Sequence, residues 1–261
     1  MLINVQTMDH LKVDVNKVVN EFDNRAENLR DENAVLDARD NPKVAHQNVF
    51  RNYHTKKTVI KYLKPTLTDV VLDFGCGVGR LSNHIAPLVK KVFGADKSTK
   101  MLKIASEINS SNKNVSYQHF NSYPLPFENK SFSKIFTYWV LQHVDNNELK
   151  DTFRDFYRIL QDNGMVYLFE QVRSNESIVL DNIHHQRKRE EYHELMKDAG
   201  FRFINAERVF RYPSYSLSIW SKYSGASKFL LGLLSRLELV TANRKPEHII
   251  YSTDVLIYQK I

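Results

Sequence analysis

The sequence predicts an α/β fold, in which a mostly parallel sheet carries helices on both faces and follows a helical cap. Three observations lead to this prediction. Strand and helix patterns alternate over residues 66–172, an apolar run at 70–74 leads into a glycine-rich loop, and residues 1–64 show only helical patterns. Alternation of this kind implies parallel strands joined by crossover helices. A chain of 261 residues has room for one such domain with a cap.

Residues 1–64 are interpreted as the helical cap. An apolar stripe at helical spacing runs from Val15 to Phe22 in a charged background. The segment 23–40 is rich in charge, which predicts an exposed helix or a loosely held arm. A second helix is expected over residues 43–63.

The apolar strands and amphipathic helices that follow are assigned to one domain, residues 65–261. Strands are predicted at 69–74, 91–96, 114–120, 132–138, 164–171, 201–210 and 254–260, and helices at 79–88, 98–109, 146–159 and 187–199.

An insertion, residues 211–250, separates the last two predicted strands and is longer than a tight hairpin. Long connections in compact domains are usually functional or mobile. We interpret this one as a substrate lid or a dimer surface, and an extra core helix is the plain alternative. A membrane-surface helix is favoured less, because the apolar run 229–234 is short and lacks a clear basic face in the sequence.

Composition limits the class of protein and its surroundings. No stretch of 18 apolar residues occurs, and the first residues lack the pattern of a signal peptide. The single cysteine, Cys76, excludes an internal disulfide and a cysteine-rich zinc site, which favours a reducing, cytoplasmic location. The net charge of +7 is spread along the chain without an RNA-binding signature, so nucleic acid is not an expected partner.

The loop after the first strand has glycine at every second position, at Gly75, Gly77 and Gly79, and Asp73 precedes it. Glycines allow a sharp turn and a close approach of the backbone to a ligand. The spacing differs from the dinucleotide fingerprint and from the phosphate-binding P-loop. Taken alone, the loop is also compatible with a tight strand–helix turn that binds nothing.

A second acid makes a ligand site the better interpretation. Asp96 ends the next predicted strand, 17 residues after Gly79. In nucleotide-binding α/β folds, an acid at this position accepts hydrogen bonds from ribose hydroxyls.

Together with two later blocks, these motifs resemble the class I S-adenosylmethionine (SAM)-dependent methyltransferases, in the ubiquinone-biosynthesis-like and small-molecule branch. The four blocks are 73–79, 96–102, 121–144 and 158–170, and the resemblance covers about residues 45–205. It implies a Rossmann-like sheet of seven strands with an antiparallel last strand. It also implies SAM as cofactor and S-adenosylhomocysteine (SAH) as product.

The resemblance assigns a set of residues to the cofactor: Arg51, Asp73, Gly75, Cys76, Gly77, Gly79, Asp96, Lys97, Met101, Asn121, Ser122 and Tyr138. Met101 would pack on the adenine, and Asn121, where the family usually has Asp, would accept from the adenine amino group. Arg51 would meet the cofactor carboxylate. The ring of Tyr138 would lie near the sulfonium, where an aromatic face stabilises positive charge.

Two residues are candidates for the base that a hydroxyl acceptor needs. His143 follows the fourth strand at the carboxyl edge of the sheet, and Glu170 ends the fifth strand. A structural role is the alternative for each: His143 would hold the turn or the cofactor, and Glu170 would cap a helix. The basic run 184–189 is interpreted as a solvated face or, with Arg211, as an anion site. No metal is required for methyl transfer.

The sequence thus predicts methyl transfer from SAM to a hydroxyl of a small molecule, or of a sugar at a glycan terminus, with an anionic acceptor fitting the basic residues. An N-methyltransferase of an amine, an RNA methyltransferase and a non-catalytic protein with the same fold are the alternatives. A homodimer through residues 211–250 is a further expectation.

Overall fold

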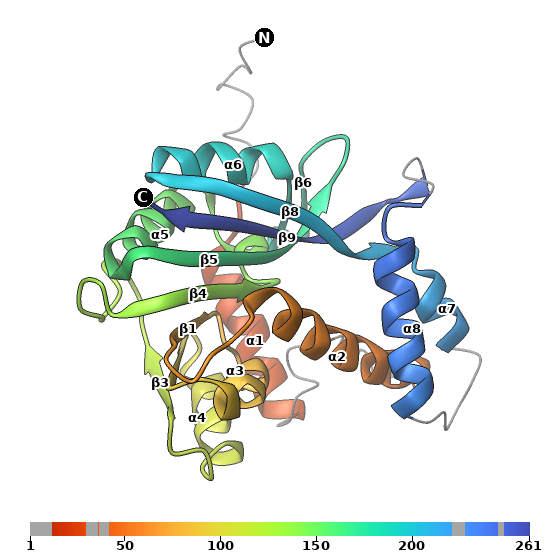
Figure 1. Cartoon of the computed structure of the whole chain (residues 1–261), viewed down its shortest axis with the longest axis horizontal. Helices are drawn as coiled ribbons and strands as arrows, with labels where there is room; N and C mark the ends of the chain where they lie inside the picture. The colour runs from red at the N-terminus through yellow and green to blue at the C-terminus, as the bar shows by residue number, and fades with distance from the viewer. Residues whose placement is uncertain (1–11, 30–35, 37–41, 221–227, 245–247) are drawn as a thin grey trace.

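The computed structural model describes residues 12–29, 36, 42–220, 228–244 and 248–261. Its centre is a sheet whose main strands run in the order β3, β2, β1, β4, β5, β9, β8 (Figure 1). Their bounds are β1 Val70–Phe74, β2 Lys91–Asp96, β3 Val115–His119, β4 Phe132–Tyr138, β5 Leu160–Arg173, β8 Phe201–Tyr212 and β9 Tyr251–Lys260. β1 to β5 pair in parallel, and β9 is antiparallel to both β5 and β8. The predicted fold class is confirmed.

Helices cover both faces of this sheet (Figure 1). They are α3 Arg80–Ile85, α4 Thr99–Ile108, α5 Asn146–Ile159 and α6 Arg189–Asp198, with short 3-10 turns η3 at Ala86–Leu88 and η4 at Leu141–His143. The first turns of α4 and α5 are capped as the sequence predicts: Ser98 Oγ accepts from Met101 N, and Asp145 Oδ1 accepts from Asn147 N. The central strands are buried on both faces, which explains their continuous apolar sequence.

A hairpin that the sequence analysis did not predict extends the sheet at the C-terminal end of β5. It consists of β6 Ile178–Leu180 and β7 His184–Lys188, and β7 pairs with β5 at Val172 and Arg173. The helix predicted from residue 187 therefore begins at Arg189. The interpretation of 184–189 as a solvated face is wrong, because His185 and Arg187 are buried on one face of β7.

The N-terminal region forms α1 Val15–Leu29 and α2 Pro42–Leu63. α1 packs against α4, whereas α2 packs against α3 and against the two helices of the insertion. Residues 23–29 of the predicted charged arm are thus helical, and most of 30–40 lies outside the described residues.

The insertion contributes α7 Tyr215–Trp220 and α8 Lys228–Thr241. Their apolar residues form a small core of their own with α2 and the end of β8, made of Phe50, Phe210, Leu217, Trp220, Leu231 and Leu234. Among the described residues, no helix combines the length and apolar character needed to span a bilayer.

Candidate active site

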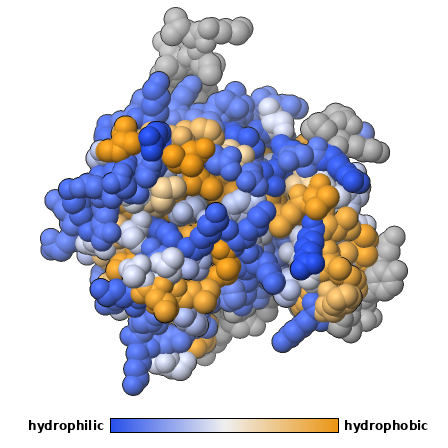
Figure 2. All heavy atoms as spheres, viewed as in Figure 1, coloured by the Kyte–Doolittle hydropathy of each residue, from blue (hydrophilic) through white to orange (hydrophobic). Residues whose placement is uncertain are grey.

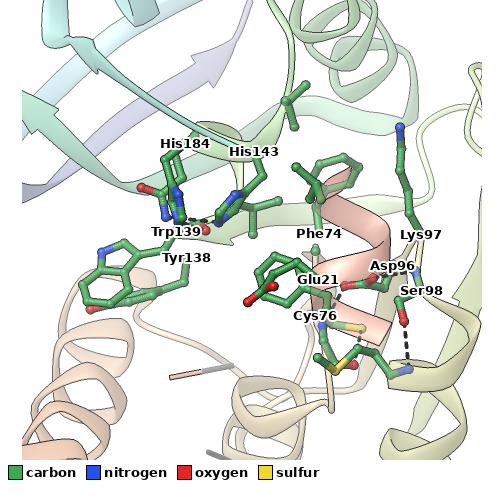
Figure 3. Close-up of a pocket in the computed structure, with 18 of the residues that line it drawn as sticks. Glu21, Phe74, Cys76, Asp96, Lys97, Ser98, Tyr138, Trp139, His143 and His184 are labelled. Carbon is green, nitrogen blue, oxygen red and sulfur yellow. Dashed lines mark hydrogen bonds between the residues drawn. The ribbon is translucent and has the colours of Figure 1, made fainter. Parts of the chain in front are cut away.

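A cavity of about 940 Å³ lies at the carboxyl ends of β1, β2 and β4 (Figure 3). Its walls come from segments that are far apart in the sequence: α1, α2, the loop after β1, the ends of β2 and β4, and the segment from β5 to β7. Ligands of open α/β sheets bind at this edge, so the predicted site and the cavity coincide.

The glycine loop forms one end of the cavity. Gly75, Gly77 and Gly79 have φ angles of 72°, 54° and 72°, in the left-handed region that favours glycine. A Cβ on Gly75 would lie 2.3 Å from Val140 Cγ1, so this glycine also lets the loop pack against the end of β4. Gly75, Cys76 and Gly77 line the cavity.

Asp96 is held in place by the backbone. Its Oδ2 accepts from Gly77 N at 2.8 Å and its Oδ1 accepts from Ser98 N at 2.8 Å. Each carboxylate oxygen can accept more than one hydrogen bond, so both retain capacity for a ligand hydroxyl. Burial raises the pKa of Asp96, and the backbone N–H groups oppose this shift. Asp73 lies deeper, accepts from Ser82 Oγ at 2.6 Å, and has its pKa raised to about 7 by burial.

α1 forms a wall of the cavity that the sequence analysis did not assign. Ser98 Oγ donates to Asp23 Oδ1 at 2.5 Å, which ties α1 to the start of α4. Met101 lines the cavity and is fully buried in a cluster with Ala26 of α1. Glu21, Phe22 and Arg25 of α1 also line the cavity. The apolar stripe predicted the helix but not the surface that it covers.

Three further residues assigned to the cofactor lie at the cavity. Lys97 forms an ion pair with Glu148 of α5. The Tyr138 hydroxyl accepts from Thr55 Oγ1 at 3.0 Å, and Arg51 lies on α2.

Three other assigned residues do not line the cavity. Asn121 and Ser122 are exposed in the loop after β3, and Phe120 lines the cavity in their place. The predicted contact of Asn121 with adenine is therefore not supported. Gly79 lies behind the loop, where a Cβ would be 2.1 Å from Tyr117 Oη. It is required for packing rather than for ligand contact.

His143 faces the cavity from η4 (Figure 3). Its Nδ1 lies 2.7 Å from the carbonyl oxygen of Ile183 and therefore donates to it, which leaves Nε2 as the acceptor. Burial and the neighbouring His184 lower the pKa of His143 to about 3. The ring of Phe22 packs against it edge-on at 5.2 Å. The imidazole is thus neutral at physiological pH with a fixed tautomer, and its Nε2 lone pair accepts from Gln142 Nε2 at 3.3 Å.

Glu170 is fully buried and does not line the cavity. Its Oε1 accepts from Thr137 Oγ1 at 2.6 Å and from Val140 N at 3.2 Å. Burial raises its pKa to about 7. The interpretation of Glu170 as a base is therefore wrong, because the carboxyl group holds the loop after β4 instead of facing the acceptor.

The wall beside His143 carries polar residues that the sequence analysis missed. Gln171 follows Glu170 on β5 and points to the opposite face, and Gln186 Nε2 donates to its Oε1 at 2.7 Å. Trp139 and Tyr251 complete this side, with Trp139 Nε1 donating to Thr253 Oγ1 at 2.9 Å. Because successive side chains of a strand point to opposite faces, the burial of Glu170 would have predicted that Gln171 lies on the other face of β5.

The anion site proposed from the basic run is not formed. Arg187 donates to the carbonyl oxygens of Leu141 and Val144 at 2.7 Å and 2.6 Å. Arg211 donates to Pro213 O at 3.0 Å and also to Arg244 O. Both guanidinium groups are buried and hold backbone carbonyls, so they do not face an acceptor.

Comparisons with known proteins agree with this geometry. Residues 71–164 match the sequence model of a family described as a methyltransferase domain. Over 144 residues the chain is 26% identical to phosphoethanolamine N-methyltransferase 3 of Arabidopsis thaliana, and this aligned region covers 54% of this chain and 29% of that protein. Over 121 residues it is 30% identical to demethylmenaquinone methyltransferase of Tropheryma whipplei strain Twist, which covers 46% of this chain and 49% of that protein.

Among solved structures, phosphoethanolamine N-methyltransferase 2 of Haemonchus contortus in complex with SAM has a TM-score of 0.61 at 21% identity, covering 88% of this chain and 59% of that one. At this identity the likeness shows the fold. The chain spans under a third of the Arabidopsis relative and about half of the Tropheryma relative.

Fold, sequence blocks and comparisons together confirm the predicted class: this is a class I SAM-dependent methyltransferase domain, and SAM is the cofactor of that class. The residues present fit such a cofactor. Asp96 retains acceptor capacity for ribose hydroxyls, and Gly77 has no side chain that would keep the cofactor from the backbone. Phe74 and Phe120 offer apolar surface to the adenine ring.

Proposed function

We propose that this protein transfers the methyl group of SAM to a hydroxyl oxygen of a small molecule or of a sugar at a glycan terminus. The observation that carries the proposal is the continuity of the cavity. One space joins Asp96 and the glycine loop to His143 and to the glutamines of β5 and β7. Its volume of about 940 Å³ is at the upper end of the range of roughly 300–1,000 Å³ for small-molecule sites, so it has room for a cofactor and a small acceptor.

In this proposal, SAM supplies a methyl group on a sulfonium, and the protein supplies alignment and proton acceptance. Asp96 and the glycine loop bind the nucleoside. α1 covers the cavity and excludes water, and placing two reactants together contributes roughly 7–11 kcal/mol in favourable cases. His143 Nε2 accepts the proton of the acceptor hydroxyl, while the carbonyl of Ile183 fixes its tautomer.

Transfer to an amine nitrogen is the second candidate. Glu21 of α1 lines the cavity beside its aromatic residues. Its Oε1 accepts from Arg25 Nε at 2.8 Å, and the acceptor sites that the carboxylate retains suit a cationic acceptor. The similarity to phosphoethanolamine N-methyltransferases supports the same candidate.

A screen of SAM consumption over matched hydroxyl and amine acceptors tests the proposal. With a hydroxyl acceptor we expect a rate that is flat from pH 6 to 8, because the pKa of His143, lowered to about 3, keeps the imidazole neutral throughout. With an amine acceptor the rate would rise with pH as the amine loses its proton. Turnover of amines alone would reject the hydroxyl proposal.

The same screen defines the role of His143. We expect His143→Ala to lower turnover of a hydroxyl acceptor by about tenfold, because a base whose pKa is lowered to about 3 contributes less than the ~10²–10⁴-fold of a base matched to the working pH. Affinity for SAH should stay within about threefold of the wild type. His193→Gln, on α6 and away from the cavity lining, is the matched control and should leave both unchanged. Unchanged turnover in His143→Ala would exclude it as the base.

A further inference from the structure

Helix α8 carries an apolar stripe on its outer face, which we call the α8 stripe. Its members Phe229, Leu233, Leu237 and Val240 are 75%, 45%, 36% and 71% exposed. Their spacing of four, four and three residues places them on one side of the helix. Apolar surface gathers over α8 in Figure 2. The opposite side of α8 is occupied, because Leu231 and Leu234 belong to the core formed with α2.

Among the described residues of the insertion, the exposed charges beside the α8 stripe are positive. Lys228 and Arg236 are exposed on the same face of α8, and Arg244 is exposed just beyond its end. The helix has one acid, Glu238, which is buried and accepts from Ser214 Oγ at 2.6 Å. The described residues 228–244 contain three basic residues and this one acid.

We infer that α8 docks this protein on an anionic membrane surface. Apolar side chains on one face of a helix, flanked by cations, are the features that place a helix in the plane of the headgroups. At 14 residues α8 is about 21 Å long, which suits lying on a bilayer rather than crossing it. The basic face that the sequence alone did not reveal is formed because folding buries the only acid of the helix.

A second copy of the chain fits this face less well. A two-fold contact between two α8 helices would bring the same patch against itself, and Arg236 lies within that patch. The cations of the two copies would then be close together in a contact of low polarity, without an acid from α8 to pair with them. Anionic headgroups supply the missing charge.

The docking face is also near the candidate active site. Phe210 belongs to the same apolar core as Leu231 and Leu234, and it lines the cavity. One layer of side chains therefore connects the inner side of α8 to the cavity wall. Docking does not depend on the methyl transfer proposed above, so either proposal can fail alone.

Flotation of the 261-residue chain with unilamellar vesicles tests the inference. One set of vesicles is phosphatidylcholine, and the other contains about one third phosphatidylglycerol. We expect flotation with the anionic vesicles at low salt, little flotation with the neutral ones, and a strong decrease at about 0.5 M salt. No flotation with anionic vesicles, or equal flotation with both kinds, would overturn the inference.

Two variants with matched controls locate the surface. Phe229→Gln is expected to lower vesicle partitioning about tenfold, whereas Leu67→Gln, at a residue 74% exposed before β1, should leave it within twofold. Arg236→Gln should lower it about fivefold, and Lys103→Gln on α4 should not. Equal losses in variant and control would contradict the assignment to α8. The inference would also be contradicted if light scattering showed that the wild type is a dimer and that Phe229→Gln is a monomer.

Discussion

The two ends of the cavity are built in different ways. At the cofactor end, backbone groups hold the site: the glycine loop has left-handed φ angles, and Asp96 accepts from the N–H groups of Gly77 and Ser98. At the acceptor end, side chains from α1, η4, β5, β7 and β9 converge. A site made by local backbone geometry is readable in a motif, whereas a site assembled from five distant segments is not. Mutations in the glycine loop should therefore affect folding, whereas mutations at the acceptor end should affect binding of the acceptor.

The largest expected effect is on stability and compares a glycine of the loop with one of the insertion. Gly75→Ala forces a left-handed φ on alanine and brings its Cβ against Val140, so we expect a loss of about 2–4 kcal/mol in the free energy of unfolding. Gly232→Ala, in α8, meets only Tyr53 Oη at 3.4 Å. It should be neutral or stabilise by up to about 1 kcal/mol. Urea denaturation measures both, and equal losses would contradict the comparison.

Glu170→Gln tests the buried carboxyl group between the two ends. Because burial raises its pKa from 4.5 to about 7, the folded protein retains a proton that the unfolded chain releases in this interval. Wild-type stability therefore falls as pH rises from about 4.5 to 7. The glutamine is neutral at every pH, so the difference in stability between variant and wild type should change in favour of the variant by up to ~3 kcal/mol between pH 5 and pH 8. Denaturation at the two pH values measures this.

The activity of the same variant decides the role of Glu170. The amide oxygen introduced by Glu170→Gln would still accept from Thr137 and Val140, so turnover should stay within about threefold of the wild type. A loss of a hundredfold or more at unchanged SAH affinity would restore Glu170 as a reacting group.

Asp96→Ala tests the cofactor end. It removes the carboxylate that fits the ribose hydroxyls and frees Gly77 N, so we expect affinity for SAH to fall about 100-fold by calorimetry. Asp198→Ala, on an exposed position of α6, is the control and should not change the affinity. If Asp96→Ala binds SAH as tightly as the wild type, the cofactor does not bind at Asp96 and the glycine loop.

The smallest effect is expected at the acceptor end. Gln186→Leu keeps the volume of the side chain and removes the hydrogen bond to Gln171, so the KM for the acceptor should rise about tenfold. The SAH affinity should stay within twofold. Gln118→Leu, on β3 outside the cavity lining, is the control. A change in SAH affinity equal to the change in KM would show that the two ends are not separable.

The sequence supports the fold prediction because its signals are periodic and local. The strands from β1 to β5 appear as apolar runs, and caps such as Ser98 and Asp145 mark where helices begin. The errors share a cause. The position of Asn121 in its motif predicts a contact with adenine, but Asn121 and Ser122 are exposed in the loop after Phe120. The charges of residues 184–189 predict a solvated face, but β7 pairs with β5, and His185 and Arg187 are buried.

Short stretches of the sequence are sufficient to predict the sheet, the glycine loop and the acid that follows it, because strand length, backbone freedom and spacing are properties of short segments. Three features emerge only in the folded chain: α1 covers the cavity, Glu170 faces away from it, and the outer face of α8 is apolar and positive. Each of these depends on which surfaces meet after residues far apart in the chain pack together, and that packing is set by the shape of the whole core rather than by any one segment.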